Sequence, residues 1–273
     1  MQDTITTMYC LCHDLLRASG HTDDQQTRYS SAEVMTVPLV AAAFFGGNLA
    51  LARNFLHSHG YTRHTLSPSR FSRRLHALPQ SLWHTLFRLL AEVFKEHNHS
   101  AAYVVDSLPI PICDNIRIKR CNLLQDEAYR GYIASKRRYF YGLRVHLLIS
   151  GSGAPIEFVL APGSEADVSV FKSLDLDLPA GSLIYADRAY TDYGEEDLLR
   201  EAAGILLQPQ RKKNSKRPLA VWQEFLSKPV RQRIETSFSQ LTNLFPKHIH
   251  AVTPQGFVLK IICFLLAFSI QCL

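Results

Sequence analysis

Two short apolar stretches, each ending in an aspartate, decide the fold expected of this chain. One is Tyr103-Val104-Val105-Asp106-Ser107, and the other is Leu183-Ile184-Tyr185-Ala186-Asp187-Arg188. Short apolar runs bounded by polar residues predict buried strands. If the two strands are neighbours in one sheet, Asp106 and Asp187 lie at the same sheet edge and their carboxylates converge.

The segments around these stretches predict a mixed sheet with helices between its strands. We expect strands and helices, in chain order, at Ala101–Val105, Tyr139–Ile149 and Ile156–Leu160 (strands), Val168–Leu174 (helix), Ser182–Ala186 (strand), Glu195–Ala203 (helix), Ile205–Gln208 (strand) and a last helix that begins before Arg231. The order of three strands, helix, strand, helix, strand and helix is that of an RNase H-like fold.

The first 98 residues have a different pattern, with helical spacing and no convincing strand. Apolar periodicity predicts helices over Ser31–Phe45, Asn48–His57 and Leu82–Phe94, and Gly46-Gly47 and Gly60 mark breaks between helices. The fold class expected is therefore α/β. An all-α N-terminal domain (1–98) precedes an RNase H-like domain (99–273) with a mixed five-stranded sheet flanked by helices.

Composition excludes several classes of protein and favours an anionic partner. Hydrophobic residues make up 47% of the chain and charged residues 20%, which is ordinary for a globular protein and argues against a disordered or fibrous chain. There are 30 Lys and Arg residues against 24 Asp and Glu residues, a formal net charge of +6. A basic balance of this kind suits nucleic acid.

Features of secreted and membrane proteins are not evident. The six cysteines lack the spacing of a disulfide scaffold or a zinc site, so we expect reduced thiols. The N-terminus lacks a basic start followed by an apolar stretch, so we expect a cytoplasmic protein. The apolar segment Phe257–Ile270 contains Lys260 and is shorter than the ~20 residues of a membrane-spanning helix, which predicts a buried core helix.

A short helix after Ser67-Pro68 is a candidate DNA-binding element. It carries Arg70, Arg73 and Arg74 on one side and Phe71 and Leu75 on the other. A basic face opposite an apolar face is typical of a helix that faces DNA. An amphipathic surface helix has the same pattern, and this alternative stays open.

A second basic region lies between the first two predicted strands. Basic residues alternate there with tyrosines, a composition suited to a DNA backbone with bases that stack nearby. A solvated hairpin loop is the alternative. The residues are Arg117, Lys119, Arg120, Arg130, Lys136, Arg137 and Arg138, with Tyr129, Tyr132, Tyr139 and Tyr141.

A third acid completes a pattern that suits two-metal chemistry. Phosphodiester cleavage with two hard cations requires carboxylates that converge on the ions. Glu235 lies in the basic segment Val230-Arg231-Gln232-Arg233-Ile234-Glu235 of the last predicted helix, from which it can reach the sheet edge. One aspartate at a strand end is usually a turn residue, whereas two such aspartates followed by an isolated glutamate are less easily explained by packing.

These residues resemble the conserved blocks of DDE transposases of bacterial insertion sequences, most closely the group named for insertion sequence nine-eight-two. The likeness spans most of the chain. Arg231 one helical turn before Glu235 is similar to the family's third block. The other similar blocks are Val105-Asp106-Ser107 with Pro109 and Asn115–Arg120, Tyr139–Leu147, Ala161–Asp167, and Ala186-Asp187-Arg188-Ala189-Tyr190.

The resemblance implies an activity, a cofactor and partners. It implies that Asp106, Asp187 and Glu235 are catalytic and bind two Mg²⁺ or Mn²⁺ ions. The enzyme would cut DNA at terminal inverted repeats and join the ends to target DNA, as a homodimer on double-stranded DNA in the bacterial cytoplasm and nucleoid. Arg188 and Arg231, next to the blocks with the acids, join the expected DNA-binding residues.

The sequence departs from related transposases at two positions. Many relatives have a tyrosine before the arginine and a lysine two turns after the glutamate, whereas this chain has Lys228 and Thr242. Lys247 is a candidate substitute for that lysine. A phosphate-positioning role for the two sites is therefore open, while the three acids are all present.

Other acids and the histidines are weighed against the three acids. Asp167 is the main rival ligand, but it stands where a helix begins, so we expect it to cap that helix. Hard cations bind oxygen and do not require imidazole, so we expect the histidines to be core or surface residues. The other rival acids are Asp114, Glu157, Asp192 and Glu195, and the histidines are His57, His59, His64 and His146.

Two other functions share parts of this pattern. A DNA-binding regulator, or a domesticated transposase, would keep the fold without needing all three acids. A hydrolytic nuclease of the same fold would keep the acids but would not join strands or bind specific ends.

Overall fold

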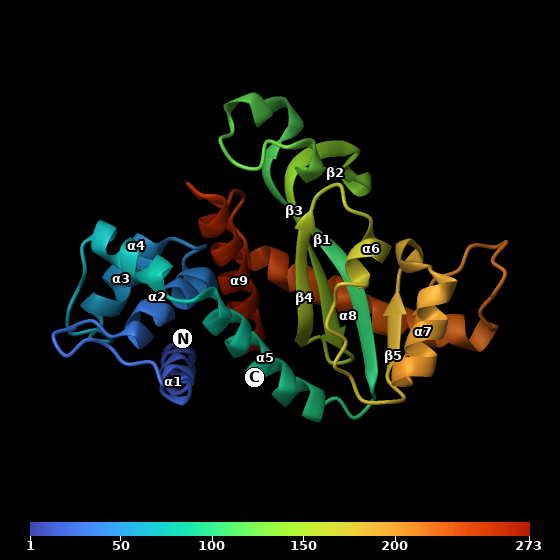
Figure 1. The fold of residues 1–273 in the computed structure, drawn as a ribbon, viewed down its shortest axis with the longest axis horizontal. Helices are drawn as coiled ribbons and strands as arrows, with labels where there is room; N and C mark the ends of the chain where they lie inside the picture. The colour runs from blue at the N-terminus through green and yellow to red at the C-terminus, as the bar shows by residue number, and fades with distance from the viewer. The chain divides into compact units, whose positions relative to one another are not determined.

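The structure is a computed structural model that describes residues 1–273, apart from the side chain of Ser135. The chain divides into two compact units (Figure 1). The helical unit consists of Met1–Leu90 and Leu241–Leu273, and the sheet unit consists of Ala91–Gln240.

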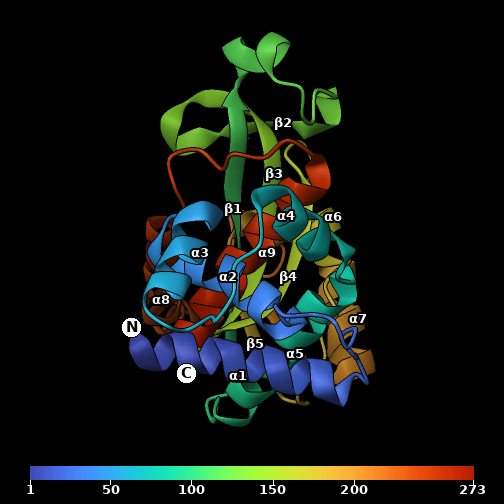
Figure 2. The same cartoon turned by 90° about the vertical axis from the view of Figure 1, so that its left-hand side faces the viewer.

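The helical unit is built around two apolar helices that pack on each other. The helices predicted at residues 31–45, 48–57 and 82–94 are all present within a few residues of the expected bounds (Figure 2). Helix α2 is buried over most of its length and packs on α1, α3 and α9. The helices are α1 (Gln2–Ala18), α2 (Ser31–Phe44), α3 (Leu49–Ser58), α4 (Pro68–Ala77), most of α5 (Gln80–Glu96), the end of α8 (Val221–Leu244) and α9 (Pro254–Gln271).

Helix α9 differs from the sequence-based expectation in its place. The sequence assigned it to the catalytic domain, whereas in the structure it packs on α2 in the helical unit. The physical reason is that both helices are apolar around most of their surface and each needs an apolar partner. By length and composition α9, and also α2 with α3 as one bent pair, could cross a membrane. The side chains from Ile261 to Ile270 are nevertheless buried, as expected of a core helix.

The start of α2 is stabilised by a reciprocal capping box. The hydroxyl oxygen of Ser30 accepts a hydrogen bond from the Glu33 N–H at 3.2 Å, and the Ser30 N–H donates to Glu33 Oε2 at 2.6 Å. Because α2 forms the centre of the unit, its first turn contributes to the stability of the unit. We expect Ser30→Ala to lower the free energy of unfolding by about 1 kcal/mol, the usual value of an N-cap.

Chemical denaturation monitored by circular dichroism measures this loss. Ser58→Ala is the matched control, since the Ser58 hydroxyl is exposed and bonds only at the other end of a helix, to Phe55 and to its neighbour His59. That control is expected to change the free energy by less than about 0.5 kcal/mol. Equal effects of the two variants would show that the capping box contributes nothing particular.

The sheet unit contains a mixed six-stranded sheet. Strands β2, β3, β1, β5 and β6 lie side by side in this order, and β4 pairs with β3. The β1–β3, β2–β3 and β3–β4 pairs are antiparallel, and the β1–β5 and β5–β6 pairs are parallel. The strands are β1 (Ala102–Asp114), β2 (Arg130–Ile133), β3 (Arg138–Ser150), β4 (Pro155–Pro162), β5 (Leu183–Ala186) and β6 (Leu206–Pro209).

The predicted mixed sheet is confirmed, but the prediction of five strands was one too low. The additional strand is β2, which has four residues and pairs with the start of β3. Strand β1 is also longer than expected and continues through Pro109 and Pro111. This is possible because its pairing with β5 ends at Val105, so that the prolines need no hydrogen-bond partner on that side.

The helices of the sheet unit cover both faces of the sheet. Figure 2 shows α6 and α8 on opposite sides of the strands. The element order of three long strands, helix, strand, helix, strand and helix agrees with the expected RNase H-like order. All six cysteines of the chain are free thiols, as expected. The helical elements are η1 (Asn115–Arg120), η2 (Glu127–Tyr129), η3 (Ala134–Lys136), α6 (Asp167–Phe171), η4 (Arg188–Tyr190), α7 (Tyr193–Ala203) and α8 up to Gln240.

Candidate active site

The two predicted aspartates lie side by side where the pairing of β1 with β5 ends. Val105 of β1 pairs with Ala186 of β5 in the last pair of the parallel ladder. Asp106 follows Val105 within β1, and Asp187 follows Ala186 directly after β5. The two aspartates therefore come next to each other in the two neighbouring chain segments. Asp187 accepts a hydrogen bond from the Ala189 N–H at 2.7 Å, which fixes the turn into η4. The sheet register therefore places the two carboxylates together.

The charges around Asp106 form a small acidic centre. Burial raises the pKa of Asp106 to about 6, against the lowering effect of a hydrogen bond from the Ser107 N–H. The negative charges of Asp187 and Asp167 raise this pKa further, and the positive charge of Arg231 lowers it. Three carboxylates and an arginine thus act on one another at this edge. Such a centre favours a divalent cation, because the cation offsets the repulsion between the carboxylates.

Asp167 does not have the capping role that the sequence predicted. Ala166 is the N-cap residue of α6, and no side chain caps the helix. The Asp167 carboxylate instead accepts a hydrogen bond from Arg144 Nη1 at 3.4 Å and lies 3.8 Å from His146 Nε2. The partner of Asp167 is therefore the guanidinium of Arg144 on β3, which is distant in sequence.

The predicted glutamate lies on the helix that also brings Arg231 near the aspartates. Glu235 is one turn after Arg231 on α8 and is exposed. Among the described side chains, no three His, Cys, Asp or Glu residues are close enough to enclose a metal ion. The structure therefore brings Asp106 and Asp187 together, whereas Glu235 on α8 does not form a three-residue group with them among the described side chains.

The two aspartates provide donor atoms that fit a hard cation. Asp106 and Asp187 offer oxygen atoms, which Mg²⁺ and Mn²⁺ prefer. Burial and the carboxylates of Asp187 and Asp167 raise the pKa of Asp106, and a bound cation would offset this cost of its negative charge. The two aspartates would hold the ions, and Glu235 would complete the set from α8.

A buried network next to the aspartates was not predicted from the sequence. His146 on β3 is fully buried, and its Nδ1 lies 3.2 Å from the hydroxyl of Tyr190, three residues after Asp187. Burial lowers the pKa of His146 to about 4, although Asp167 acts in the opposite direction, so the imidazole is neutral at pH 7. The expectation that His146 is a core residue is confirmed. Its partner Tyr190 was missed because this contact joins segments that are distant in sequence.

The arginines of α4 do not all face solvent. Phe71 and Leu75 are buried, as the amphipathic pattern predicted. Arg74 forms an ion pair with Asp23 at 3.0 Å and donates to the backbone oxygen of Tyr29, so it binds within the helical unit. Arg70 and Arg73 are exposed, and they remain the candidates for DNA contact on this helix.

Several side chains of the basic and aromatic segment in the sheet unit contact one another around β2. The ring of Tyr132 lies 4.9 Å from that of Tyr139, and the Arg130 guanidinium lies 4.5 Å above the Tyr139 ring. Arg138 forms an ion pair with Asp114 at 3.2 Å. The other predicted DNA-binding residues of the sheet unit are exposed, except Arg231, which is half-buried; the exposed ones are Arg117, Lys119, Arg120, Lys136, Arg137 and Arg188.

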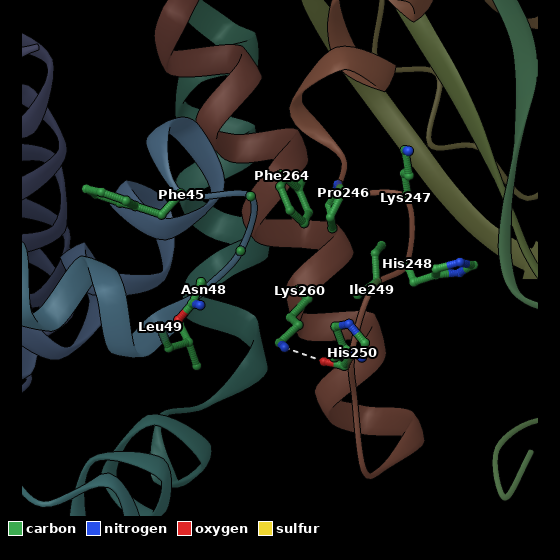
Figure 3. Close-up of a pocket in the computed structure, with 12 residues that line it drawn as sticks. Phe45, Asn48, Leu49, Pro246, Lys247, His248, Ile249, His250, Lys260 and Phe264 are labelled. Carbon is green, nitrogen blue, oxygen red and sulfur yellow. Dashed lines mark hydrogen bonds between the residues drawn. The ribbon is translucent and has the colours of Figure 1, made fainter.

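A basic cavity of about 610 Å³ lies in the helical unit (Figure 3). The turn between α2 and α3, the segment after α8, and α9 line it. Lys247, His248, His250 and Lys260 are its ionisable lining residues, and no acid is among the residues that line it. Lys260 points toward His250 and donates to its backbone oxygen. The cavity suits an anionic group, and it includes Lys247, the residue suggested above as a substitute lysine.

Comparisons with known proteins gave a family match and a similar solved structure. Residues 96–250, more than half of the chain, match the family described as Transposase DDE domain. A similar solved structure is a Mos1 transposase paired-end complex with left transposon end. It has 10% sequence identity over 84% of this chain and 82% of that chain, with a TM-score of 0.26. Comparison with curated proteins gave no match.

Proposed function

The chain belongs to the family of DDE-domain transposases, and we propose that it cuts DNA at terminal inverted repeats and joins the ends to target DNA. The observation that carries this proposal is the pairing of Val105 with Ala186, which sets Asp106 and Asp187 at one sheet edge. We also propose that it belongs to the bacterial group named for insertion sequence nine-eight-two and acts in the cytoplasm as a homodimer on DNA.

The proposed chemistry assigns a role to each acid. Asp106, just after the last β1–β5 pair, and Asp187, just after β5, would hold two divalent cations, and Glu235 would complete the ligand set from α8. Bound Mg²⁺ or Mn²⁺ would activate the attacking oxygen and stabilise the leaving oxygen. Arg231, whose charge already acts on Asp106, would hold a DNA phosphate beside the carboxylates.

The decisive experiment is cleavage and joining of labelled terminal-repeat DNA in Mg²⁺ or Mn²⁺. A transposase yields cut ends and joined products. A regulator would bind the DNA without cutting it, which would contradict the proposal. A nuclease would cut without joining or preference for the ends, and this outcome would contradict the strand-transfer part.

Arg70 and Arg73 are the proposed DNA contacts of the helical unit. Each arginine that neutralises a phosphate contributes about 0.9 to the slope of log affinity against log salt. The double variant Arg70→Gln/Arg73→Gln is therefore expected to reduce this slope by about 2 and to weaken end binding about tenfold at moderate salt.

Fluorescence anisotropy over a range of salt concentrations measures both quantities. Arg17→Gln is the control, because Arg17 is an exposed arginine on α1, outside the basic regions. An unchanged slope in the double variant would mean that α4 is an amphipathic surface helix and not a DNA-binding helix.

A further inference from the structure

Asp167, Arg144 and the buried pair His146–Tyr190 form a network beside the aspartates. Arg144 Nη1 lies 3.4 Å from both Asp167 Oδ1 and Ser107 Oγ, and Arg144 Nη2 donates to the Tyr132 backbone oxygen at 2.9 Å. The guanidinium thus stands between the residue next to Asp106 and the Asp167 carboxylate. The network joins β1, β3 and α6 at the sheet edge that carries the acids.

Strand alternation separates this network from the side chain of Asp106. Ser107 pairs with His146 and Asp106 pairs with Leu147, so Ser107, His146 and Arg144 share one face of the sheet and Asp106 belongs to the other. Helix α6, which carries Asp167, lies on the opposite side of the sheet from α8, which carries Arg231 (Figure 2). Asp167 is therefore badly placed to share a metal ion with Asp106 and Glu235.

Charge is the means by which Asp167 acts on the centre. The carboxylate of Asp167 pairs with the guanidinium of Arg144, and the charges of Asp167 and Arg231 both act on Asp106. Without Asp167, the charge of Arg144, whose Nη1 lies 3.4 Å from the hydroxyl of Ser107 next to Asp106, would lack a counter-charge and would repel a cation bound at the aspartates. The buried Nε2 of His146, which has no hydrogen-bond partner, supplies no charge because the imidazole is neutral.

We propose that Asp167 is a positioning residue that neutralises Arg144, so that no uncompensated positive charge stands beside Asp106 and Asp187 to repel divalent cations. The inference rests on the proposed metal-dependent function. It differs from a ligand role in one respect: removal of the Arg144 charge compensates for the loss of Asp167.

Mn²⁺ binding to the full chain, measured by electron paramagnetic resonance without DNA, tests this inference. Asp167→Asn keeps the size of the side chain and is expected to weaken Mn²⁺ binding about tenfold, since the negative charge that offsets Arg144 is removed. The double variant Asp167→Asn/Arg144→Gln is expected to return to within about threefold of the wild type, because the charge sum is restored. Glu165→Gln, an exposed neighbour of Asp167, is the control and is expected to bind as the wild type does.

The outcomes separate the competing explanations. A double variant as weak as Asp167→Asn would overturn the inference and make Asp167 a ligand. An Asp167→Asn variant that binds Mn²⁺ like the wild type would also overturn it. A loss of Mn²⁺ binding that the double variant and Asp167→Glu fail to restore, with a lower melting temperature, would show a structural role only. Failure of the wild type to bind Mn²⁺ would instead contradict the proposed metal-dependent function itself.

Discussion

Asp106→Asn is expected to slow strand cleavage at a transposon end by about a thousandfold or more, with unchanged affinity for the DNA. Asparagine has the shape of aspartate but lacks the charge that would hold a cation where the pairing of β1 with β5 ends. Asp187→Asn is expected to have the same effect, because Asp187 follows the residue paired with Val105. Glu235→Gln tests whether α8 supplies the third ligand. Single-turnover cleavage in saturating Mn²⁺ measures the rates, and anisotropy measures the binding.

A control variant and two possible results test the assignment of the three acids. Glu201→Gln removes an exposed acid from α7 and is expected to cut at the wild-type rate. If Asp106→Asn and Asp187→Asn cut as well as the wild type, these aspartates are not the catalytic acids and a different set must be sought. If only Glu235→Gln remains active, the two aspartates stand and the third ligand lies elsewhere.

The sequence was informative about this site because strand ends carry a local signal. An apolar run followed by an aspartate predicts both a buried strand and the position where it ends, and β5 ends at Ala186 as expected. The parallel register between β1 and β5 then follows from burial of both runs in one sheet. The extension of β1 through Pro109 and Pro111 could not be predicted, since prolines argue against a strand unless one side is known to lack a partner.

Contacts between segments that are distant in sequence could not be predicted from local sequence patterns. Asp167 begins a helix, so its position predicted a cap, whereas its side chain pairs with Arg144 on β3. Tyr190 and His146 gave no pattern of their own, because their contact depends on how η4 packs against β3. Helix α9 likewise revealed by its composition that it is buried, but an apolar surface does not specify which helix covers it.

The second large effect expected of Asp106→Asn is on stability. Burial and the neighbouring carboxylates raise the pKa of Asp106 to about 6, from an ordinary value of 3.8. A carboxyl whose pKa is higher in the folded protein stabilises the fold when protonated, below pH ~4, and this contribution is lost as pH rises through ~6. At 1.36 kcal/mol per pKa unit, the ionised carboxylate destabilises the protein by up to about 3 kcal/mol at pH 8.

Asparagine cannot ionise, so the variant should escape this destabilisation. In a chelating buffer at pH 8, we expect Asp106→Asn to be more stable than the wild type by up to about 3 kcal/mol, with the difference absent near pH 4. Chemical denaturation at several pH values measures it. Mn²⁺ should stabilise the wild type more than the variant, because a cation that binds only the folded state adds to its stability. A variant that is less stable than the wild type at pH 8 would mean that Asp106 is held by favourable contacts, and the metal-site assignment would lose its electrostatic support.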